Sequence, residues 1–201
     1  MSSSPFDPSR SALLSMDLQA GIVSIYTSGN SELVSRAALL LDHGRHAGMM
    51  VIHVKVEFRR GLPEINSRNK LLGALKASPN HQRLFEGPTG SFHSDVAPIE
   101  GDIVVTKSRV NAFAGTDLEL LLRARDIHTL VMFGIATSGV VLATALHAAD
   151  NDYRLFIVKD CCADLDAAVH DCLVEKLLPK CAMVLSAEEM LSLIGPISIA
   201  N

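Results

Sequence analysis

The sequence predicts a three-layer α/β/α domain in which helices cover both faces of a six-stranded parallel sheet. Short apolar runs alternate with stretches of helical periodicity along the chain, the pattern of repeated βαβ units. The runs are nearly continuously apolar, as expected for strands that are buried on both faces. With 201 residues, the chain is long enough for one substantial core. We therefore expect a polar leader at 1–10 and one Rossmann-like domain over 11–201.

Each expected element has a local signal. The strands are expected at 11–18, 49–56, 102–107, 130–133, 154–158 and 181–185. Residues 31–47 have the apolar spacing of an amphipathic helix that ends before Gly48. Thr116 and Glu119 form a capping-box pattern that opens a helix through Arg125. Further helices are expected after Gly139, over 167–178 up to Pro179, and after the cap at 186–189.

The least regular part of the chain is 59–98, which is rich in glycine and proline. A short helix is expected there at 71–76. Segments of this length in a small domain are usually functional. We expect this one to serve as a lid or as an oligomer contact.

The overall composition excludes several function classes. The net charge is −4 without a basic block, which argues against nucleic acid and anionic membranes as partners. The longest apolar runs are too short to cross a bilayer. The polar N-terminus lacks a signal-peptide pattern, and the four cysteines form no CxxC pair, which fits a reducing compartment. We expect a cytoplasmic protein that acts on a small molecule.

Polar residues follow three of the expected strands. Asp17 ends the first, Lys107 ends the third, and the turn 137–140 leads from the fourth strand into a helix. The carboxyl ends of neighbouring parallel strands converge, and ligands bind there. Asp17 and Lys107 could therefore meet and favour each other's charged form. The alternative is a solvated loop acid and a surface lysine.

Three motifs resemble the isochorismatase-like hydrolases, which take in nicotinamidases, carbamoylsarcosine amidases and isochorismatases. They are Asp17–Gln19, Lys107–Phe113 and Gly134–Ala145, and the likeness runs from about 12 to 186. The resemblance implies a six-stranded parallel sheet and, in the amidase branch, an Asp–Lys–Cys triad. It also implies a cis peptide at Ile135–Ala136 and a homodimer or homotetramer.

The third motif departs from the family's amidase pattern. By the resemblance, Asp17 matches the acid and Lys107 the lysine, whereas Val140 occupies the position of the nucleophilic cysteine. Valine has no lone pair, so a covalent acyl-enzyme cannot form at this position.

Three other residues could replace the missing nucleophile. Thr137 and Ser138 are better explained as helix-capping residues, since no base is evident for their activation. Cys162 follows the fifth expected strand and is better explained as a buried structural thiol. None of the three is preferred as a nucleophile.

A metal site is not expected either. Nicotinamidase-like members of the family bind a metal through an Asp and two His residues. The histidines with candidate positions show no Asp-x-His spacing: His43, His46, His53, His81 and His93. His147 and His170 lack partner ligands in the sequence. We predict no metal and no cofactor.

The isochorismatases of this family also lack the cysteine, and they hydrolyse a vinyl ether to release pyruvate. That reaction needs a general acid and water. Asp17 is the expected acid, positioned by Lys107, with Arg109 or Gln19 binding a substrate carboxylate. Burial must then outweigh the effect of Lys107, which lowers the pKa of Asp17. The other residues expected at the pocket are Phe113, Ile135, Ala136, Thr137, Ser138 and Gly139.

Two further functions remain open. A catalytically inactive member could keep the pocket for ligand binding or its surface for assembly, since Val140 is what drift after loss of chemistry would produce. An amidase with a displaced nucleophile, Ser138 or Cys162, is the weaker alternative.

Overall fold

A computed structural model describes residues 6–27 and 31–195. Within these residues, six strands form one fully parallel sheet in the order β3-β2-β1-β4-β5-β6. The strands are β1 (Ser11–Met16), β2 (Met50–Val56), β3 (Ile103–Lys107), β4 (Thr129–Ile135), β5 (Arg154–Ala163) and β6 (Met183–Leu185). The predicted fold class is confirmed.

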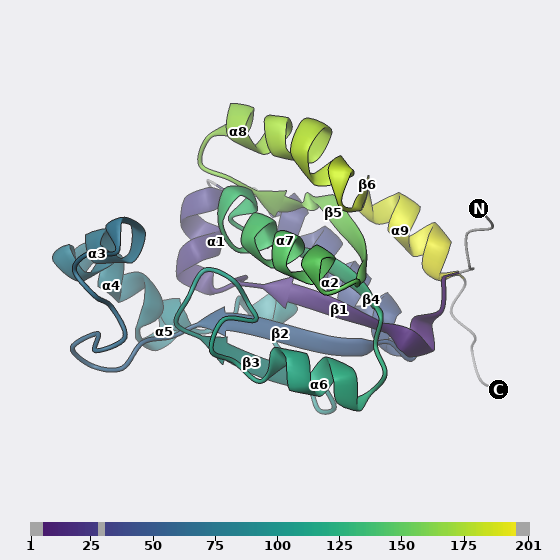
Figure 1. The fold of residues 1–201 in the computed structure, drawn as a ribbon, viewed down its shortest axis with the longest axis horizontal. Helices are drawn as coiled ribbons and strands as arrows, with labels where there is room; N and C mark the ends of the chain where they lie inside the picture. The colour runs from purple at the N-terminus through teal and green to yellow at the C-terminus, as the bar shows by residue number, and fades with distance from the viewer. Residues whose placement is uncertain (1–5, 28–30, 196–201) are drawn as a thin grey trace.

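Helices cover both faces of the sheet (Figure 1). On one face, α2 (Glu32–His46) packs against β1, β2 and β5 and against α9 (Ala187–Ile194). The other face carries α6 (Leu118–Ala124), α7 (Leu142–Asp150) and α8 (Ala167–Cys172). No described helix combines the length and the apolar character needed to span a bilayer.

The central strands are buried because both of their faces are covered. Every residue of β1 and of β4 is buried, which explains why their sequences are apolar runs without alternation. Polar groups of these two strands can therefore meet a ligand only at the strand ends. The functional site is expected at such an end.

Strands β4 and β5 are longer than the sequence predicts. Gly134 continues β4 to Ile135 because its φ of 145° suits glycine alone. Beside it, the register between β4 and β5 shifts, and β5 runs to Ala163. Asp160, Cys161 and Cys162 therefore belong to the strand, and the predicted strand end at residue 158 is wrong.

The predicted helix at 167–178 is present, but only its first part is α-helical. After α8 the chain continues through a π-helical turn at Leu173–Leu177 and a 3-10 turn at Leu178–Lys180.

The predicted capping box at Thr116 is wrong. Helix α6 starts only at Leu118, and the Thr116 hydroxyl donates to the Ala112 carbonyl at 2.7 Å.

Near the N-terminus, two short elements were not predicted. A 3-10 turn, Pro8–Arg10, lies within the expected polar leader and is capped by Asp7; residues 1–5 of that leader lie outside the described part. Helix α1 (Ala20–Tyr26) directly follows the first strand.

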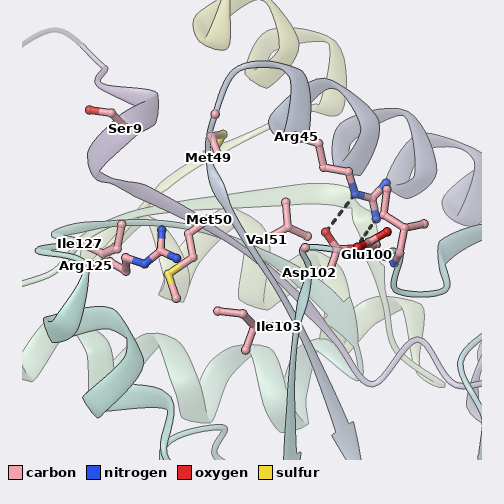
Figure 2. A pocket seen from close by; sticks show the side chains of 13 residues that line it. Ser9, Arg45, Met49, Met50, Val51, Glu100, Asp102, Ile103, Arg125 and Ile127 are labelled. Carbon is pink, nitrogen blue, oxygen red and sulfur yellow. Dashed lines mark hydrogen bonds and ion pairs between the residues drawn. The ribbon is translucent and has the colours of Figure 1, made fainter.

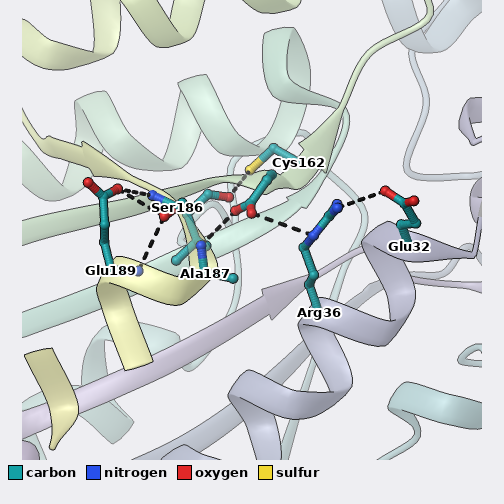
Figure 3. Close-up of polar contacts among 8 residues, drawn as sticks. Glu32, Arg36, Cys162, Ser186, Ala187 and Glu189 are labelled. Carbon is teal, nitrogen blue, oxygen red and sulfur yellow. Dashed lines mark hydrogen bonds and ion pairs between the residues drawn. The ribbon is translucent and has the colours of Figure 1, made fainter. Parts of the chain in front are cut away.

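A polar cluster joins β5 to the two helices on the α2 face (Figure 3). Arg36 donates to Glu32 at 2.7 Å and lies 3.6 Å from Asp160. Asp160 also accepts from the Ala187 amide at 2.8 Å. Beside it, Ser186 and Glu189 form the predicted capping box of α9. These bonds satisfy the first amides of α9 that its own helix cannot reach.

A second polar cluster fixes the end of α2 at the amino-terminal edge of the sheet. Arg45 donates to both carboxylate oxygens of Asp102, at 3.2 and 2.7 Å (Figure 2). His53, fully buried in β2, contacts the same carboxylate at 3.0 Å. Burial lowers the pKa of His53, and Asp102 opposes this only in part.

We predict that Gly134→Ala lowers the free energy of unfolding by about 2–4 kcal/mol. A Cβ at this position would meet the Met16 carbonyl oxygen at 2.0 Å, and that oxygen belongs to the neighbouring strand, so it cannot move aside. The control is Gly48→Ala, where φ is also positive but no atom lies within 4 Å. Urea denaturation of both variants measures the difference. An equal loss in both would contradict a role for the β1–β4 contact.

The buried His53 predicts a loss of stability in mild acid. Its pKa is lowered in the folded protein, whereas the unfolded chain titrates near 6.5. In mild acid the unfolded state therefore binds more protons than the folded state. The stability that neutral His53 contributes is fully present above pH ~6.5 and is lost as the pH falls through its folded-state pKa. Wild-type stability should fall below pH 7 more steeply than that of His53→Gln. His46→Gln, an exposed histidine, is the control and should follow the wild type.

Candidate active site

Asp17 and Lys107 form a buried ion pair at the carboxyl edge of the sheet. Lys107 Nζ donates to Asp17 Oδ2 at 2.7 Å and to the Arg109 carbonyl at 3.0 Å. The two residues are only 6% and 3% exposed. Strand β2 separates their strands, so the long lysine side chain spans it. The predicted meeting of the two side chains is confirmed.

The pKa of the Asp17 carboxyl is shifted upward in the folded protein. Burial raises its pKa more than Lys107 lowers it, so the net shift is upward. Its second oxygen, Oδ1, is buried and has no hydrogen-bond partner among the described residues. Of the two opposing effects on the pKa of Asp17, burial is therefore larger than that of Lys107. A protonated Asp17 can donate from a site that water hardly reaches.

The pair lies at the base of a cavity of about 250 Å³. Its polar side chains are those of Asp17, Lys107, Arg109 and Tyr26. The remaining lining is apolar or glycine: Ile22, Ile25, Val56, Phe58, Leu71, Leu72, Leu75, Leu84, Phe85, Val110, Ile135, Ala136, Gly139 and Val140.

The outer wall of this cavity comes from the 59–98 segment, which is less irregular than predicted. It contains α3 (Lys70–Ala77), α4 (Pro79–Gln82), α5 (Gly87–Gly90) and 3-10 turns at Arg83–Phe85 and Ser94–Val96. Figure 1 shows α3 to α5 beyond the carboxyl ends of β1 and β2. The predicted helix at 71–76 is present. The segment contributes residues to the cavity wall, and its role as a lid or as an oligomer contact stays a prediction.

The turn after β4 forms the inner wall. The Ile135–Ala136 peptide is cis, at the bond that the family resemblance implies. A π-helical turn follows at Thr137–Val141, in which the Ala136 carbonyl accepts from the Gly139 and Val141 amides at 3.1 and 3.3 Å. Val140 is 2% exposed and places a methyl-bearing side chain at the cavity wall.

Thr137 and Ser138 do not line the cavity, which corrects the predicted lining. The Thr137 hydroxyl is fully buried and lies 2.8 Å from His170 Nδ1. The Ser138 amide donates to Asp164 at 2.7 Å. A base does therefore adjoin Thr137, contrary to the sequence prediction, but the pair is outside the cavity. Both contacts hold the turn against α8 and the chain before it.

Gln19 and Phe113 are also absent from the lining. The Gln19 amide donates to the Val56 and Gly90 carbonyls at 3.1 and 2.7 Å and accepts from the Val56 amide at 2.8 Å. It ties the 59–98 segment to the sheet and has no free group for a carboxylate. Phe113 stacks on His147, with ring centroids 4.6 Å apart.

Arg109 does lie at the cavity. It donates to the Ser108 and Glu64 backbone carbonyls at 2.7 and 3.0 Å. No carboxylate of the described residues forms an ion pair with it. A guanidinium has five N–H donors, so the group keeps donors and a full charge for a ligand.

Sequence reasoning missed the contribution of α1, which brings Ile22, Ile25 and Tyr26 to the cavity. Their spacing of three and four residues was a helical signal, although the helix has only seven residues. Burial, then Asp164 and Asp17, raises the pKa of Tyr26, so its hydroxyl stays neutral beside the pair.

The described histidines do not fit a metal site. His43 contacts the Gly195 carbonyl at 2.6 Å, and the Asp102 carboxylate beside His53 is already engaged by Arg45. No group of three or more His, Cys, Asp or Glu in the described chain could hold a metal ion. The expectation of a metal-free site stays a prediction.

Comparison with known proteins gives the family. The model of the isochorismatase domain matches residues 11–189. The chain belongs to the isochorismatase family, whose members are hydrolases. An uncharacterized isochorismatase family protein of Bacillus subtilis is 32% identical, over 92% of this chain and 94% of its own length. Maleamate amidohydrolase of Pseudomonas putida is 30% identical, over 80% of this chain and 75% of its own.

A solved isochorismatase family protein from Burkholderia thailandensis has the same fold. It superposes with a TM-score of 0.82 and 26% identity, covering 96% of this chain and 98% of its own. The parallel sheet with helices on both faces is thus the family's architecture.

Within this isochorismatase-family hydrolase, no cysteine of the described chain lines the cavity. Cys161 and Cys162 are buried, and burial raises the pKa of Cys162 to about 12. The Cys162 thiol donates to the Val158 carbonyl at 3.3 Å. A thiol this reluctant to ionise is a poor nucleophile, and it fits the structural role predicted for it.

The site predicts a measurable pKa for Asp17. Carboxyl ¹³C NMR titration should show it above the ordinary value of 3.8. In Lys107→Met the pKa should rise further, because Lys107 holds it down. Lys55→Met removes a lysine paired with Glu57 and should leave Asp17 unchanged. An Asp17 pKa that falls on removal of Lys107 would show that the charge of the lysine does not act on the acid.

Proposed function

We propose that the protein hydrolyses an isochorismate-like vinyl ether and releases pyruvate, with Asp17 as the general acid. The supporting observation is the buried Asp17 carboxyl at the cavity, whose pKa is raised and whose Oδ1 has no hydrogen-bond partner among the described residues. Acid-catalysed hydrolysis needs no covalent nucleophile, which agrees with Val140 at the cavity wall.

Each charged side chain has a role in this proposal. Asp17 transfers its proton to the terminal carbon of the enol ether, and water adds to the resulting oxocarbenium ion. Lys107 stabilises the aspartate that forms, at the moment when the negative charge develops. Arg109 binds the carboxylate of the enolpyruvyl group. The hemiketal then collapses to pyruvate and an alcohol, and a proton from the added water returns to Asp17.

Amide hydrolysis is less well supported. Two relatives are named as amidohydrolases, but the described cavity lining contains no cysteine, serine or threonine. Ser138 lies outside the cavity, and Cys162 is a poor thiolate former. A displaced nucleophile therefore has no candidate within reach.

Ligand binding without turnover is the second candidate function. It is favoured by Val140, since the valine fills the position of the family's nucleophile. A largely apolar cavity with an intact ion pair would remain useful for binding. Such a protein would bind enol ethers and release no pyruvate. A cytoplasmic homodimer or homotetramer, without a cofactor, stays our expectation for either function.

Replacing Asp17 by asparagine tests the proposal. Pyruvate release from isochorismate, measured with lactate dehydrogenase, should fall by roughly 10²–10⁴-fold, the usual contribution of a general acid. Asparagine tolerates the left-handed backbone of this position, where φ is 56°, so the variant should fold.

Asp152→Asn is the matched control, since Asp152 also has a positive φ, of 63°, but is exposed and away from the cavity. It should keep wild-type activity. Full activity in Asp17→Asn would rule out Asp17 as the general acid. A folded wild type that releases no pyruvate but binds enol ethers would establish the binding function instead.

A further inference from the structure

Arg109 is the cation of the cavity that is best placed to bind a ligand carboxylate. Among the described lining residues the charged side chains are Asp17, Lys107 and Arg109. Lys107 already contacts Asp17 at 2.7 Å. Arg109 forms no ion pair with an acidic side chain of the described chain, so its guanidinium can pair with one carboxylate of the ligand.

Much of the described cavity wall offers no hydrogen bonds from side chains. Helix α1, Phe58 and the 59–98 segment contribute these aliphatic or aromatic residues to it: Ile22, Ile25, Phe58, Leu71, Leu72, Leu75, Leu84 and Phe85. A hydroxyl or carboxylate placed against this wall would lose its water without gaining a side-chain partner. An alkyl or aromatic group would instead bury apolar surface at about 25 cal/mol per Å².

The volume is sufficient for such a group. A cavity of ~150 Å³ lined by apolar side chains can hold benzene. The cavity here has about 250 Å³, which is room for one six-membered ring and a small polar head.

We propose that the substrate is the enolpyruvyl ether of an apolar alcohol, with its single carboxylate on Arg109 and its hydrocarbon body against α3. This inference rests on the proposed function and narrows it. Isochorismate itself carries a second carboxylate and a hydroxyl on its ring, and both would face the apolar wall. The protein therefore selects against the polar ring and for a hydrocarbon one.

The reaction is a hydrolysis that balances with water alone. The enol ether and water yield pyruvate and the apolar alcohol. The bond between the pyruvyl carbon and the ether oxygen breaks, and a bond from the same carbon to the water oxygen forms. Asp17 gives one proton to the methylene carbon, the alcohol oxygen takes one from the hemiketal hydroxyl, and Asp17 regains its proton from the added water.

Two enol ethers test the substrate class: 2-(cyclohexyloxy)acrylate and isochorismate. Pyruvate release is measured for both, and each kcat/KM is divided by the rate of acid hydrolysis without protein to remove intrinsic reactivity. The expected ratio favours the cyclohexyl ether by about tenfold or more, as one buried ring should produce. A ratio of one, or one that favours isochorismate, overturns the inference and leaves the proposed hydrolysis intact.

A matched pair of variants locates the effect. Leu71 of α3 lines the cavity and is 65% exposed, and Leu120 of α6 does not line it and is 68% exposed. Leu71→Arg adds a second cation to the wall and should move the preference toward isochorismate by about tenfold. Leu120→Arg should leave the ratio unchanged. Equal effects of the two variants would show that the apolar wall does not determine the substrate preference.

Binding separates the inference from the proposed reaction. The saturated analogue 2-(cyclohexyloxy)propanoate cannot be hydrolysed, so calorimetry measures its affinity whether or not the protein is a catalyst. Binding that weakens in Leu71→Arg supports the ligand class even if no enol ether releases pyruvate, an outcome that would refute only the hydrolysis. Absence of binding, together with absence of cyclohexyl ether turnover, overturns the inference.

Discussion

The buried ion pair of Asp17 and Lys107 constrains the rest of the site. Two charges can leave water only if they pair closely, and here the partners come from strands that are separated by β2. The pairing therefore depends on the strand order and on the lysine side chain reaching across one strand. The same burial that makes the pair costly also raises the pKa of Asp17. Burial is thus the common cause of the energetic cost of the pair and of the raised pKa of Asp17.

The features predictable from sequence were those that depend on the course of the backbone. Continuous apolar runs predicted the parallel sheet, and the sheet placed Asp17 and Lys107 at one edge. The strand-to-helix turn placed Val140 at the cavity wall. In each case a position at the end of a strand is enough to predict that the residue lies near the site. The direction of its side chain is not needed for that prediction.

The features that could not be predicted depend on contacts between distant parts of the chain. Gln19 is occupied by backbone groups of Val56 and Gly90, and Thr137 meets His170, which follows 33 residues later. No local pattern records these pairings. The length of β4 was underestimated because glycine is typical of turns, so the strand was expected to stop at Gly134. The close approach of Gly134 to Met16, which explains the glycine, is not visible in the sequence.

The 59–98 segment has a small apolar cluster of its own, made by Leu62, Ile65 and Leu75. Phe58 and Phe85 pack against both this cluster and the core of the sheet. Leu75 also belongs to the cavity wall. A substitution at Leu75 would therefore change the wall without removing a residue of the sheet core. New specificities could therefore evolve on an unchanged catalytic base.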